Sequence, residues 1–487
     1  MSDVRVRFAP SPTGKIHIGN IRTALVNYLF ANKNDGDFIL RIEDTDQERS
    51  SDEFADIIEK EMDWLGLKWD EGVEVGGEFG PYYQMERLDI YQEYVEKLIE
   101  ADLAYYCYCE PEELDEMREE QLANDQPPIY DQRCRELTKE EREKLEAEGK
   151  NPAVRFRVPR NDDTIVVDDL IKGKVSFERE VIDDFVIMKS DGIPTYNFAV
   201  VIDDYLMEIS HVIRGEDHLS NTPKQKLIYQ ALDWETPNFA HLPMILGSDK
   251  SKLSKRSGED YVFVGEYRTK GYLPEALFNF LALLGWSPKN DQEIFSQEEL
   301  VKEFSIENVN KSSAVFDVDK LNWMNGLYIR EAELDRIIDL ALPYLEAAEY
   351  NLSNKSQEWI ELLVDTVRDS LDYVAQITEE VDIFFGDLEY NNKKEAIEEF
   401  SQEQVDLVLE TLKENITGLN SFEPQNIRQM LKDTMNELPV GGRLFFHPTR
   451  VALTGKTSGP ELYSVIALLG KEKSVNRLEQ ALDLIEA

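Results

Sequence analysis

The sequence lacks the features that carry a chain into or across a membrane. No run of about 18 or more apolar residues occurs in it, which argues against a membrane-spanning helix. The segment Met1–Pro10 alternates charged with apolar residues and contains no apolar signal-peptide core. We therefore expect a cytoplasmic protein with no membrane partner.

Cysteine is scarce, and basic residues are far outnumbered. Three cysteines form an odd count, which together with the missing export signal argues against a disulfide framework. The chain has 53 Lys and Arg against 98 Asp and Glu, a net charge of −45. Such a chain repels nucleic acid on average, so a nucleic-acid partner requires a local basic surface. The acid is spread over solvated helical stretches such as Glu110–Glu120, which favours a role in solubility or in a high-salt cytoplasm.

Length and pattern indicate several domains that begin with an α/β fold. At 487 residues and 42% hydrophobic content, we expect about three to five domains. A strand over Val4–Ala9, a turn, a helix from Gly19 that ends at Gly36, and a strand over Phe38–Ile42 form a β–α–β unit. This unit is the usual opening of a doubly wound parallel sheet.

The pattern changes twice further along the chain. Between Tyr105 and Lys189 it resembles an α+β insertion, after which the sheet resumes with predicted strands over Tyr196–Ile202 and Met207–Ile213. Beyond Glu333 the chain is nearly all amphipathic helix. The predicted parts are a nucleotide-binding domain in two halves, 1–104 and 190–246, the insertion 105–189, a lysine-rich region 247–332 and a helical region 333–487.

The turn Pro10–Asn20 is a candidate phosphate site. A helix N-terminus offers unpaired N–H groups and a partial positive charge, which attract phosphate. Gly19 leaves the backbone bare for a stacked nucleotide, and His17 is placed to donate a hydrogen bond to a phosphate oxygen. A helix cap with a surface histidine would explain the same residues.

A second candidate site is the loop Ser248–Gly258, which carries four cations within the seven residues 250–256. Its serines and glycine make it flexible, so that it can close on a triphosphate and stabilise developing negative charge. The alternative is a solvated basic loop, which is less expected in so acidic a chain.

Together, the two motifs resemble those of class I aminoacyl-tRNA synthetases. His17-Ile18-Gly19-Asn20 resembles the His-Ile-Gly-His signature, with Asn in the last place, and Lys252-Leu253-Ser254-Lys255-Arg256 resembles the Lys-Met-Ser-Lys-Ser loop. Four further runs resemble the bacterial glutamyl-tRNA synthetase family: Arg7–Gly14, Arg41–Asp46, Pro194–Asn197 and Val212–Asp217.

The resemblance implies a fold and an activity. The fold is a Rossmann-like nucleotide-binding domain split by an α+β insertion and followed by an all-α region. The activity is ATP-dependent attachment of L-glutamate to tRNA(Glu) through a glutamyl-adenylate, with Mg²⁺ accompanying ATP. The resemblance further implies that the insertion grips the tRNA acceptor end, region 247–332 contacts the inner stem, and the helical region reads the anticodon. Charging of tRNA(Gln) stays open, and we expect a monomer.

The resemblance also assigns residues. It places His17, Lys252 and Lys255 in catalysis, His17, Gly19 and Lys255 at ATP, and five residues at glutamate: Arg7, Ser11, Glu43, Tyr196 and Arg214. The chemistry agrees, because a side-chain carboxylate is best held by a guanidinium and an ammonium group by a carboxylate. For Arg214, next to Glu216 and Asp217, a surface ion pair is the alternative.

Cys107 and Cys109 stand one residue apart, and 24 residues separate Cys109 from Cys134. Some members of the family bind structural zinc with this spacing and a histidine two places after the third cysteine. Here that place is Glu136, with Tyr130 nearby. We expect zinc on the three thiolates and Glu136; the alternative is three free thiols.

Other functions fit the sequence less well. A truncated relative that glutamylates a tRNA base lacks the helical region, a glutaminyl enzyme usually ends in β-barrels, and a small-molecule nucleotidyltransferase has no use for a long helical tail. A non-catalytic RNA-binding paralogue need not keep His17, Lys252, Lys255 and Arg214. In the helical region, Arg443, Arg450 and Lys456 form either a basic patch or a scattered surface.

Overall fold

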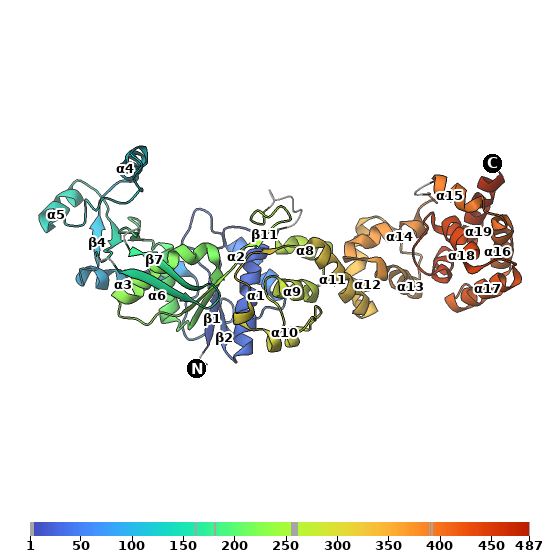
Figure 1. Cartoon of the computed structure of the whole chain (residues 1–487), viewed down its shortest axis with the longest axis horizontal. Coiled ribbons are helices and arrows are strands. Elements are labelled where there is room, and N and C mark those ends of the chain that lie inside the picture. The colour runs from blue at the N-terminus through green and yellow to red at the C-terminus, as the bar shows by residue number, and fades with distance from the viewer. Residues whose placement is uncertain are drawn as a thin grey trace. The chain divides into compact units, whose positions relative to one another are not determined.

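The computed structural model describes residues 4–160, 163–179, 182–254, 262–388, 390 and 393–486. The chain forms two units (Figure 1). The first contains Met1–Tyr267 and Leu277–Asp317, and the second contains Arg268–Ala276 and Val318–Ala487. Lys255 and Arg256 of the lysine-rich motif lie outside the described residues.

The predicted β–α–β opening is confirmed. Strands β1 (Arg5–Phe8), β2 (Asp37–Leu40) and β3 (Glu71–Gly72) form a parallel sheet in that order. Helix α1 (Ile18–Lys33) connects β1 to β2 and buries Ile21, Leu25 and Leu29 completely. The turn before α1 therefore lies at the carboxyl end of β1.

A second sheet has the strand order β7-β6-β10-β9. Strands β9 (His211–Gly215) and β10 (Asn238–Leu242) are parallel, β10 also pairs in parallel with β6 (Thr164–Asp169), and β6 forms an antiparallel hairpin with β7 (Gly173–Glu178). A hairpin from the predicted insertion thus belongs to the same sheet as β9 and β10. The backbone N–H of Ser210 donates to the carbonyl of Arg5, 3.0 Å away, and this bond joins the start of β9 to β1.

The prediction of a strand over Tyr196–Ile202 is wrong. The segment forms helix α6 (Tyr196–Leu206), and the next strand begins only at His211. Five consecutive residues, Phe198–Ile202, are at most 1% exposed because the helix lies inside a hydrophobic cluster. A helix buried on all sides loses the 3.6-residue periodicity, so its sequence resembles that of a buried strand.

The rest of the first unit consists of smaller strand pairings and further helices. Strands β4 (Ala104–Cys107), β5 (Ala153–Phe156) and β8 (Val186–Met188) form a third, antiparallel sheet, and β11 (Ile245–Leu246) pairs with β12 (Ala314–Val315). The helices are α2 (Asp52–Trp64), α3 (Leu88–Glu100), α4 (Pro111–Ala123), α5 (Lys139–Ala147), α7 (Thr222–Ala231), α8 (Val264–Lys270), α9 (Pro274–Leu283) and α10 (Gln297–Glu303), of which α8 and α9 continue into the second unit.

The all-α prediction for the C-terminal region is confirmed, since the described residues after Glu333 contain no strand. The helices of this unit are α11 (Val318–Glu331), α12 (Leu334–Ala347), α13 (Gln357–Val367), α14 (Ile377–Phe385), α15 (Lys393–Phe400), α16 (Val405–Gly418), α17 (Pro424–Glu437), α18 (Gly442–Thr454) and α19 (Leu462–Glu486). Their apolar faces share one buried core.

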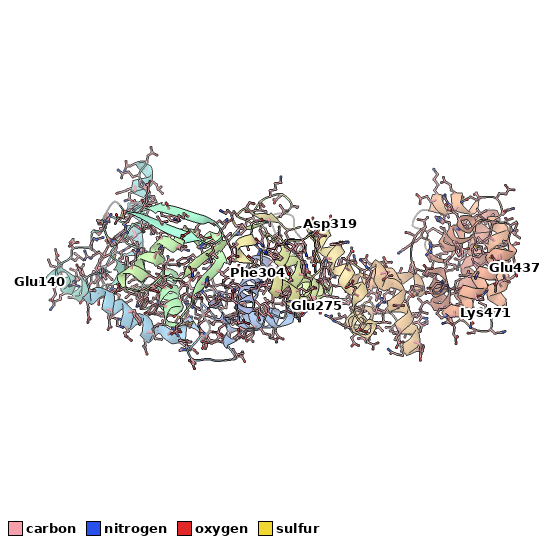
Figure 2. The ribbon with its side chains drawn as sticks, turned by 60° about the horizontal axis from the view of Figure 1, so that its bottom comes forward. Glu140, Glu275, Phe304, Asp319, Glu437 and Lys471 are labelled. Carbon is pink, nitrogen blue, oxygen red and sulfur yellow. The ribbon has the colours of Figure 1, made fainter. Side chains whose placement is uncertain are left out.

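The acidic excess lies on the surface, as the sequence predicts. Glu140 in α5 and Glu437 at the end of α17 are exposed and project from their ribbons (Figure 2). Among the described residues, no helix is long and apolar enough to cross a membrane.

Candidate active site

The first unit contains a cavity of about 680 Å³ at the carboxyl ends of β1 and β9 and the N-terminus of α1. Open parallel sheets bind ligands at this edge. The cavity brings together every described residue that the sequence assigned to ATP or glutamate: Arg7, Ser11, His17, Gly19, Glu43, Tyr196, Arg214 and Lys252. The remaining assigned residue, Lys255, lies outside the described residues.

His17 is the N-cap of α1, and its protonation state follows from that position. Its Nδ1 accepts a hydrogen bond from the backbone N–H of Gly19 at 3.1 Å, so the ring hydrogen is on Nε2. Burial, and then the charge of Lys252, lower the pKa of His17. The ring is therefore neutral at pH 7 and retains one N–H to donate.

His17 of the first motif and Lys252 of the lysine-rich motif line the same cavity. The backbone N–H of Ile18 donates to the carbonyl of Val262 at 2.9 Å, and that of Val264 donates to the carbonyl of Ile16 at 3.2 Å. The chain that follows the lysine-rich loop is thus bonded to the turn before α1. Lys252 is 65% exposed and lies 3.7 Å from Asp217, a contact weak enough for a ligand to displace.

Arg7 and Glu43 belong to a buried network of charges. Asp204 accepts from Arg7 Nε at 3.0 Å and from Nη2 at 3.2 Å, and it also accepts from Arg41 at 2.8 Å. Arg41, fully buried, donates to Glu43 at 3.1 Å. Burial raises the pKa of Glu43, while Arg41 and Arg7 oppose that shift.

Further members of this network were missed in the sequence. Asp203 accepts from Arg87 at 2.7 Å and from the Tyr91 hydroxyl at 2.8 Å, and it lies 3.7 Å from Arg41. Two consecutive acidic residues after five apolar ones were the available signal. The predicted strand ended at Ile202, whereas helix α6 continues through Asp203 and Asp204, and each of them there contacts an arginine.

Arg214 differs from Arg7, because its partners are all neutral. Nε donates to His241 at 3.1 Å, Nη1 to the Tyr196 hydroxyl at 3.3 Å, and Nη2 to Thr222 and Gln225 at 2.9 and 2.8 Å. Arg214 is only 5% exposed, and no ion pair among the described residues includes it. The surface ion pair considered as the alternative is therefore wrong. A buried guanidinium without an anion lines the cavity.

His218, which the sequence analysis did not single out, also lines the cavity. Burial, with the charge of Arg214, lowers the pKa of His218 to about 4, and its ring lies 5.4 Å from that of Tyr196. The side chain stays uncharged at neutral pH and adds no positive charge near Arg214. Its place three residues after the end of β9 was the only sequence signal.

The three cysteines converge in the first unit. Their Sγ atoms lie within 4.8 Å of one another, and those of Cys109 and Cys134 are 3.6 Å apart. The Tyr130 hydroxyl lies 3.4 Å from Cys107 Sγ and 3.6 Å from Cys109 Sγ. Hydrogen bonds with Cys109 and Cys134 lower the pKa of Cys107.

Glu136 is not part of this group, which corrects the expected ligand set. Its side chain is 82% exposed, and its carboxylate accepts from Arg157 at 2.8 Å. The Tyr130 hydroxyl, and not the Glu136 carboxylate, lies beside the thiols. A tetrahedral zinc with Zn–S bonds of about 2.3 Å separates two thiolates by about 3.8 Å, close to the 3.6 Å between Cys109 and Cys134. The donors present therefore fit zinc.

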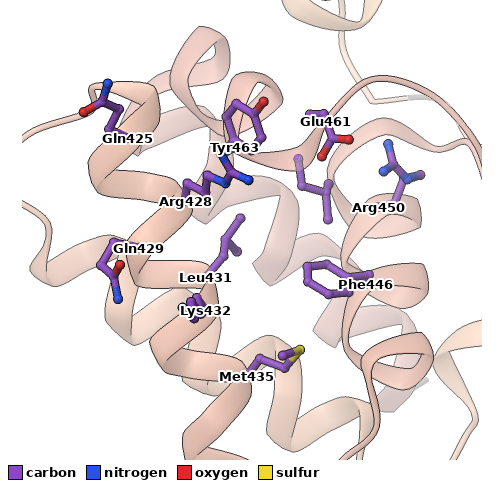
Figure 3. Close-up of a pocket in the computed structure, with 11 residues that line it drawn as sticks. Gln425, Arg428, Gln429, Leu431, Lys432, Met435, Phe446, Arg450, Glu461 and Tyr463 are labelled. Carbon is purple, nitrogen blue, oxygen red and sulfur yellow. The ribbon is translucent and has the colours of Figure 1, made fainter.

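The second unit has a cavity of about 750 Å³ lined by α17, α18 and the start of α19 (Figure 3). Three cations line it, Arg428, Lys432 and Arg450, against one acid, Glu461. Phe446, 39% exposed, is one of its two aromatic residues. This is a local basic surface in an acidic chain.

The basic patch considered from the sequence, Arg443, Arg450 and Lys456, is not the basic surface of this cavity. Of its three residues only Arg450 lines the cavity, while Lys456 lies 3.8 Å from Glu380. Arg443 is exposed and outside the lining. The cations of the cavity come from α17 and α18, which both line it.

Comparison with known families agrees with this geometry. Residues 3–323 match the family model described as tRNA synthetases class I (E and Q), catalytic domain, and residues 336–482 match an anticodon binding domain. The first part of the chain thus has the catalytic fold of a class I tRNA synthetase.

Full-length relatives narrow this class. The chain is 51% identical over 487 residues to the glutamate–tRNA ligase of Natranaerobius thermophilus, with 99% of each chain covered. It is 53% identical over 477 residues to that of Carboxydothermus hydrogenoformans, with 98% of this chain and 99% of the relative covered. A crystal structure of a glutamate tRNA ligase from Elizabethkingia meningosepticum in complex with its amino acid superposes with a TM-score of 0.88 at 36% identity, covering 99% of each chain. The chain belongs to the glutamate–tRNA ligase family.

Proposed function

We propose that the chain attaches L-glutamate to tRNA(Glu) in an ATP-dependent reaction with a glutamyl-adenylate intermediate. The observation that carries the proposal is one cavity that the N-terminus of α1, Lys252 and Arg214 all line. One end of the cavity suits phosphates, and the other end holds a guanidinium without an anion. A substrate with both an acidic side chain and an activated carboxylate complements both ends.

At the phosphate end, the chain supplies positioning and charge. The glutamate α-carboxylate attacks the α-phosphorus of ATP, a new P–O bond forms, and the bond from the α-phosphorus to the oxygen of the leaving diphosphate breaks. Magnesium, which accompanies ATP as part of the substrate, would neutralise negative charge on the phosphates. His17 donates its Nε2–H to a phosphate oxygen, and Lys252 and Lys255 stabilise the negative charge of the transition state. A Cβ on Gly19 would meet only His17 Nδ1, at 3.5 Å, so the glycine serves to keep that surface low for the nucleotide.

In the second step, a terminal ribose 2′-hydroxyl of tRNA attacks the carbonyl carbon of the adenylate. The new ester bond forms, AMP departs as the bond from carbonyl carbon to phosphate oxygen breaks, and the hydroxyl proton passes to a phosphate oxygen or to water. No side-chain nucleophile takes part. The rate comes from orientation of the two substrates in the cavity.

At the amino-acid end, Arg214 holds the side-chain carboxylate and Glu43 the ammonium group. Arg7 already shares its charge with Asp204, so it orients the substrate, together with Ser11 and Tyr196, without supplying the main attraction. The neutral partners of Arg214 leave its charge uncompensated. Glutamine, whose amide is neutral, leaves that charge unpaired and is rejected.

Charging of purified tRNA with radiolabelled glutamate tests the proposal. The wild-type chain, with ATP and magnesium, is expected to charge tRNA(Glu), and Lys255→Ala is expected to lose most of the rate. Parallel reactions with tRNA(Gln) settle whether that tRNA is also a substrate. Failure to charge either tRNA would refute the proposed function.

We propose that the cavity of the second unit receives an unpaired anticodon base. The matched anticodon binding domain spans it, its three cations attract backbone phosphates, and the exposed ring of Phe446 offers a stacking face. The roles expected for the insertion and for region 247–332 at the acceptor end and inner stem stay predictions.

Phe446→Ala is expected to raise the KM for tRNA about tenfold, because loss of one base–aromatic stack costs about 1–3 kcal/mol. The KM values for glutamate and ATP, measured in the same charging assay, should not change. Leu407→Ala is the matched control, since Leu407 is 41% exposed in α16 and outside the cavity. Equal tRNA KM values for the two variants would exclude a base at Phe446.

We propose a structural zinc held by Cys107, Cys109, Cys134 and the Tyr130 oxygen. The four donor atoms lie at distances suited to one tetrahedral ion. Zinc would tie β4 to the segment 130–134 and so brace the insertion. The metal is structural, because the cluster supplies four protein donors and leaves no open position for substrate.

Metal analysis of the purified protein is expected to find about one zinc per chain. Cys134→Ser should lose the metal, and Tyr130→Phe should bind it more weakly, as measured by competition with a chelator. Glu136→Gln is the control and should keep zinc fully, because that carboxylate faces Arg157. Metal-free wild-type protein, purified without chelator, would end this proposal.

The cytoplasmic location and the monomeric state expected from the sequence stay predictions. Sedimentation of the purified chain tests the monomer. A dimer that persists at nanomolar concentration would contradict it.

A further inference from the structure

A buried aspartate and a buried histidine lie behind Arg214. Asp169 is the last residue of β6, His241 lies in the adjacent strand β10, and Arg214 lies in β9 on the other side of β10. The side chains of Asp169 and His241 are both 0% exposed. Asp169 Oδ2 is 2.6 Å from His241 Nδ1, and His241 Nε2 is 3.1 Å from Arg214 Nε. Three strands thus each contribute one side chain to a hydrogen-bonded series, Asp169–His241–Arg214, that ends at the substrate cavity.

The direction of each hydrogen bond in this chain is fixed by its two ends. An ionised Asp169 only accepts, so Nδ1 of His241 carries the ring hydrogen. Arg214 only donates, so Nε2 of His241 must be the acceptor. Burial would raise the pKa of Asp169, but its hydrogen bond with His241 and those with backbone N–H groups hold it below the usual range. Burial lowers the pKa of His241, against the opposing effect of Asp169, and the ring is neutral.

The imidazole determines how the guanidinium faces the cavity. Its Nε2 fixes the Nε edge of Arg214, while Thr222 and Gln225 hold Nη2. With these two edges occupied, the N–H groups left for a ligand are those of Nη1, the nitrogen that also donates to the Tyr196 hydroxyl. A histidine with its hydrogen on Nε2 would point a donor at a donor and push the guanidinium out of this orientation.

We propose that Asp169 and His241 are positioning residues for the amino-acid site: the carboxylate holds the imidazole with its hydrogen on Nδ1, and the imidazole in turn fixes the guanidinium plane of Arg214. The inference rests on the proposed function, in which Arg214 binds the substrate side-chain carboxylate. It assigns a role in specificity to the end of β6, a strand from the segment expected to be an insertion.

The same aspartate also organises the hairpin turn. Asp169 Oδ1 accepts from the backbone N–H groups of Ile171 and Lys172 at 3.0 and 2.7 Å. Asparagine at this position keeps Oδ1 for the turn and replaces Oδ2 with an amide donor. The variant Asp169→Asn therefore preserves the turn but forces the hydrogen of His241 onto Nε2, against Arg214.

Steady-state charging kinetics of Asp169→Asn test the proposal. The KM for glutamate is expected to rise about tenfold or more, with the KM for ATP within about twofold of wild type. His241→Gln, whose side-chain carbonyl can accept from Arg214, should recover part of the loss seen in His241→Leu. Asp168→Asn, one residue earlier on the exposed face of β6, is the matched control and should behave as wild type.

Two outcomes would overturn the inference. One is a glutamate KM within about twofold of wild type in both Asp169→Asn and His241→Leu. The other is an equal loss of kcat/KM for glutamate, ATP and tRNA that accompanies a lower melting temperature, which would indicate a structural role alone. If the wild-type protein charges tRNA, either result leaves the proposed function intact. A wild-type protein that does not charge tRNA would refute the proposed function itself.

Discussion

Arg214→Gln is expected to lower kcat/KM for glutamate by about a hundredfold or more. The substrate carboxylate would lose Arg214, a buried cation whose described partners are all neutral, and breaking such a pair costs about 2–5 kcal/mol or more. Preference for glutamate over glutamine should fall as well, because the charge that rejects the amide is gone. The measurement is charging kinetics with each amino acid at saturating ATP and tRNA.

The same variant should remain folded, which separates a lost contact from a lost fold. Arg214 is buried without an anion, and removal of a buried unpaired charge relieves a desolvation cost. The control is Arg118→Gln, an exposed arginine in α4 that pairs with Asp115. Unchanged glutamate kinetics in Arg214→Gln would remove Arg214 from the site.

Asp204→Asn is expected to destabilise the first unit by about 3–5 kcal/mol, the usual cost of breaking a buried ion pair from one side. Its loss leaves Arg7 without its carboxylate partner and deprives Arg41 of the closest of its partners. Denaturant unfolding of the first unit measures the change. Asp115→Asn, which breaks an exposed pair of 2.9 Å, is the matched control and should cost less than about 1 kcal/mol.

The loss of unfolding free energy caused by Asp204→Asn should become smaller as the pH falls. Burial alone would raise the pKa of Asp204, but Arg7 and Arg41 outweigh it and hold the pKa below its usual range. The stabilisation by the ionised carboxylate is therefore fully present above the unfolded pKa of about 3.9 and is lost as the pH falls through the folded pKa. The difference from wild type should be constant from about pH 5 to 8 and shrink below about pH 4. A difference that grows with acidity would contradict the network.

Local sequence patterns were enough to predict the parts of the site that lie at the carboxyl ends of strands. Arg7 and Arg214 each lie in or at the end of a strand, and parallel strands bring their carboxyl ends to one edge. The turn before α1 lies at that same edge because the helix must start where the strand ends. The parallel opening, the helix and the all-α region follow from periodicity alone.

Other parts depend on contacts between distant segments, which spacing does not encode. Helix α6 was mistaken for a strand because burial on all sides removes its polar face. Because of that error, the sequence did not predict the contacts that Asp203 and Asp204 make with arginines from their positions in helix α6. The fourth donor at the cysteines was misassigned for a similar reason: Glu136 is closer in sequence to Cys134 than Tyr130 is, but Arg157 binds its carboxylate. The pairing of Asp169 with His241 joins residues 72 positions apart.

The acidity of the chain bears on how tRNA is bound. With a net charge of −45, long-range forces oppose RNA, and attraction is confined to local basic surfaces such as that of Arg428, Lys432 and Arg450. Phosphate contacts there should make tRNA binding strongly dependent on salt. In the proposed function, the cavity of the first unit would select a small anion by buried charge, and the cavity of the second unit would bind tRNA through local cations.

The most direct measurement is a crystal structure of the chain with a non-hydrolysable glutamyl-adenylate analogue. We expect the side-chain carboxylate on Arg214, the phosphate mimic at the N-terminus of α1 within hydrogen-bonding distance of His17 Nε2, and the ammonium group at Glu43. An analogue bound elsewhere, or bound in the cavity with its side-chain carboxylate turned away from Arg214, would contradict the account.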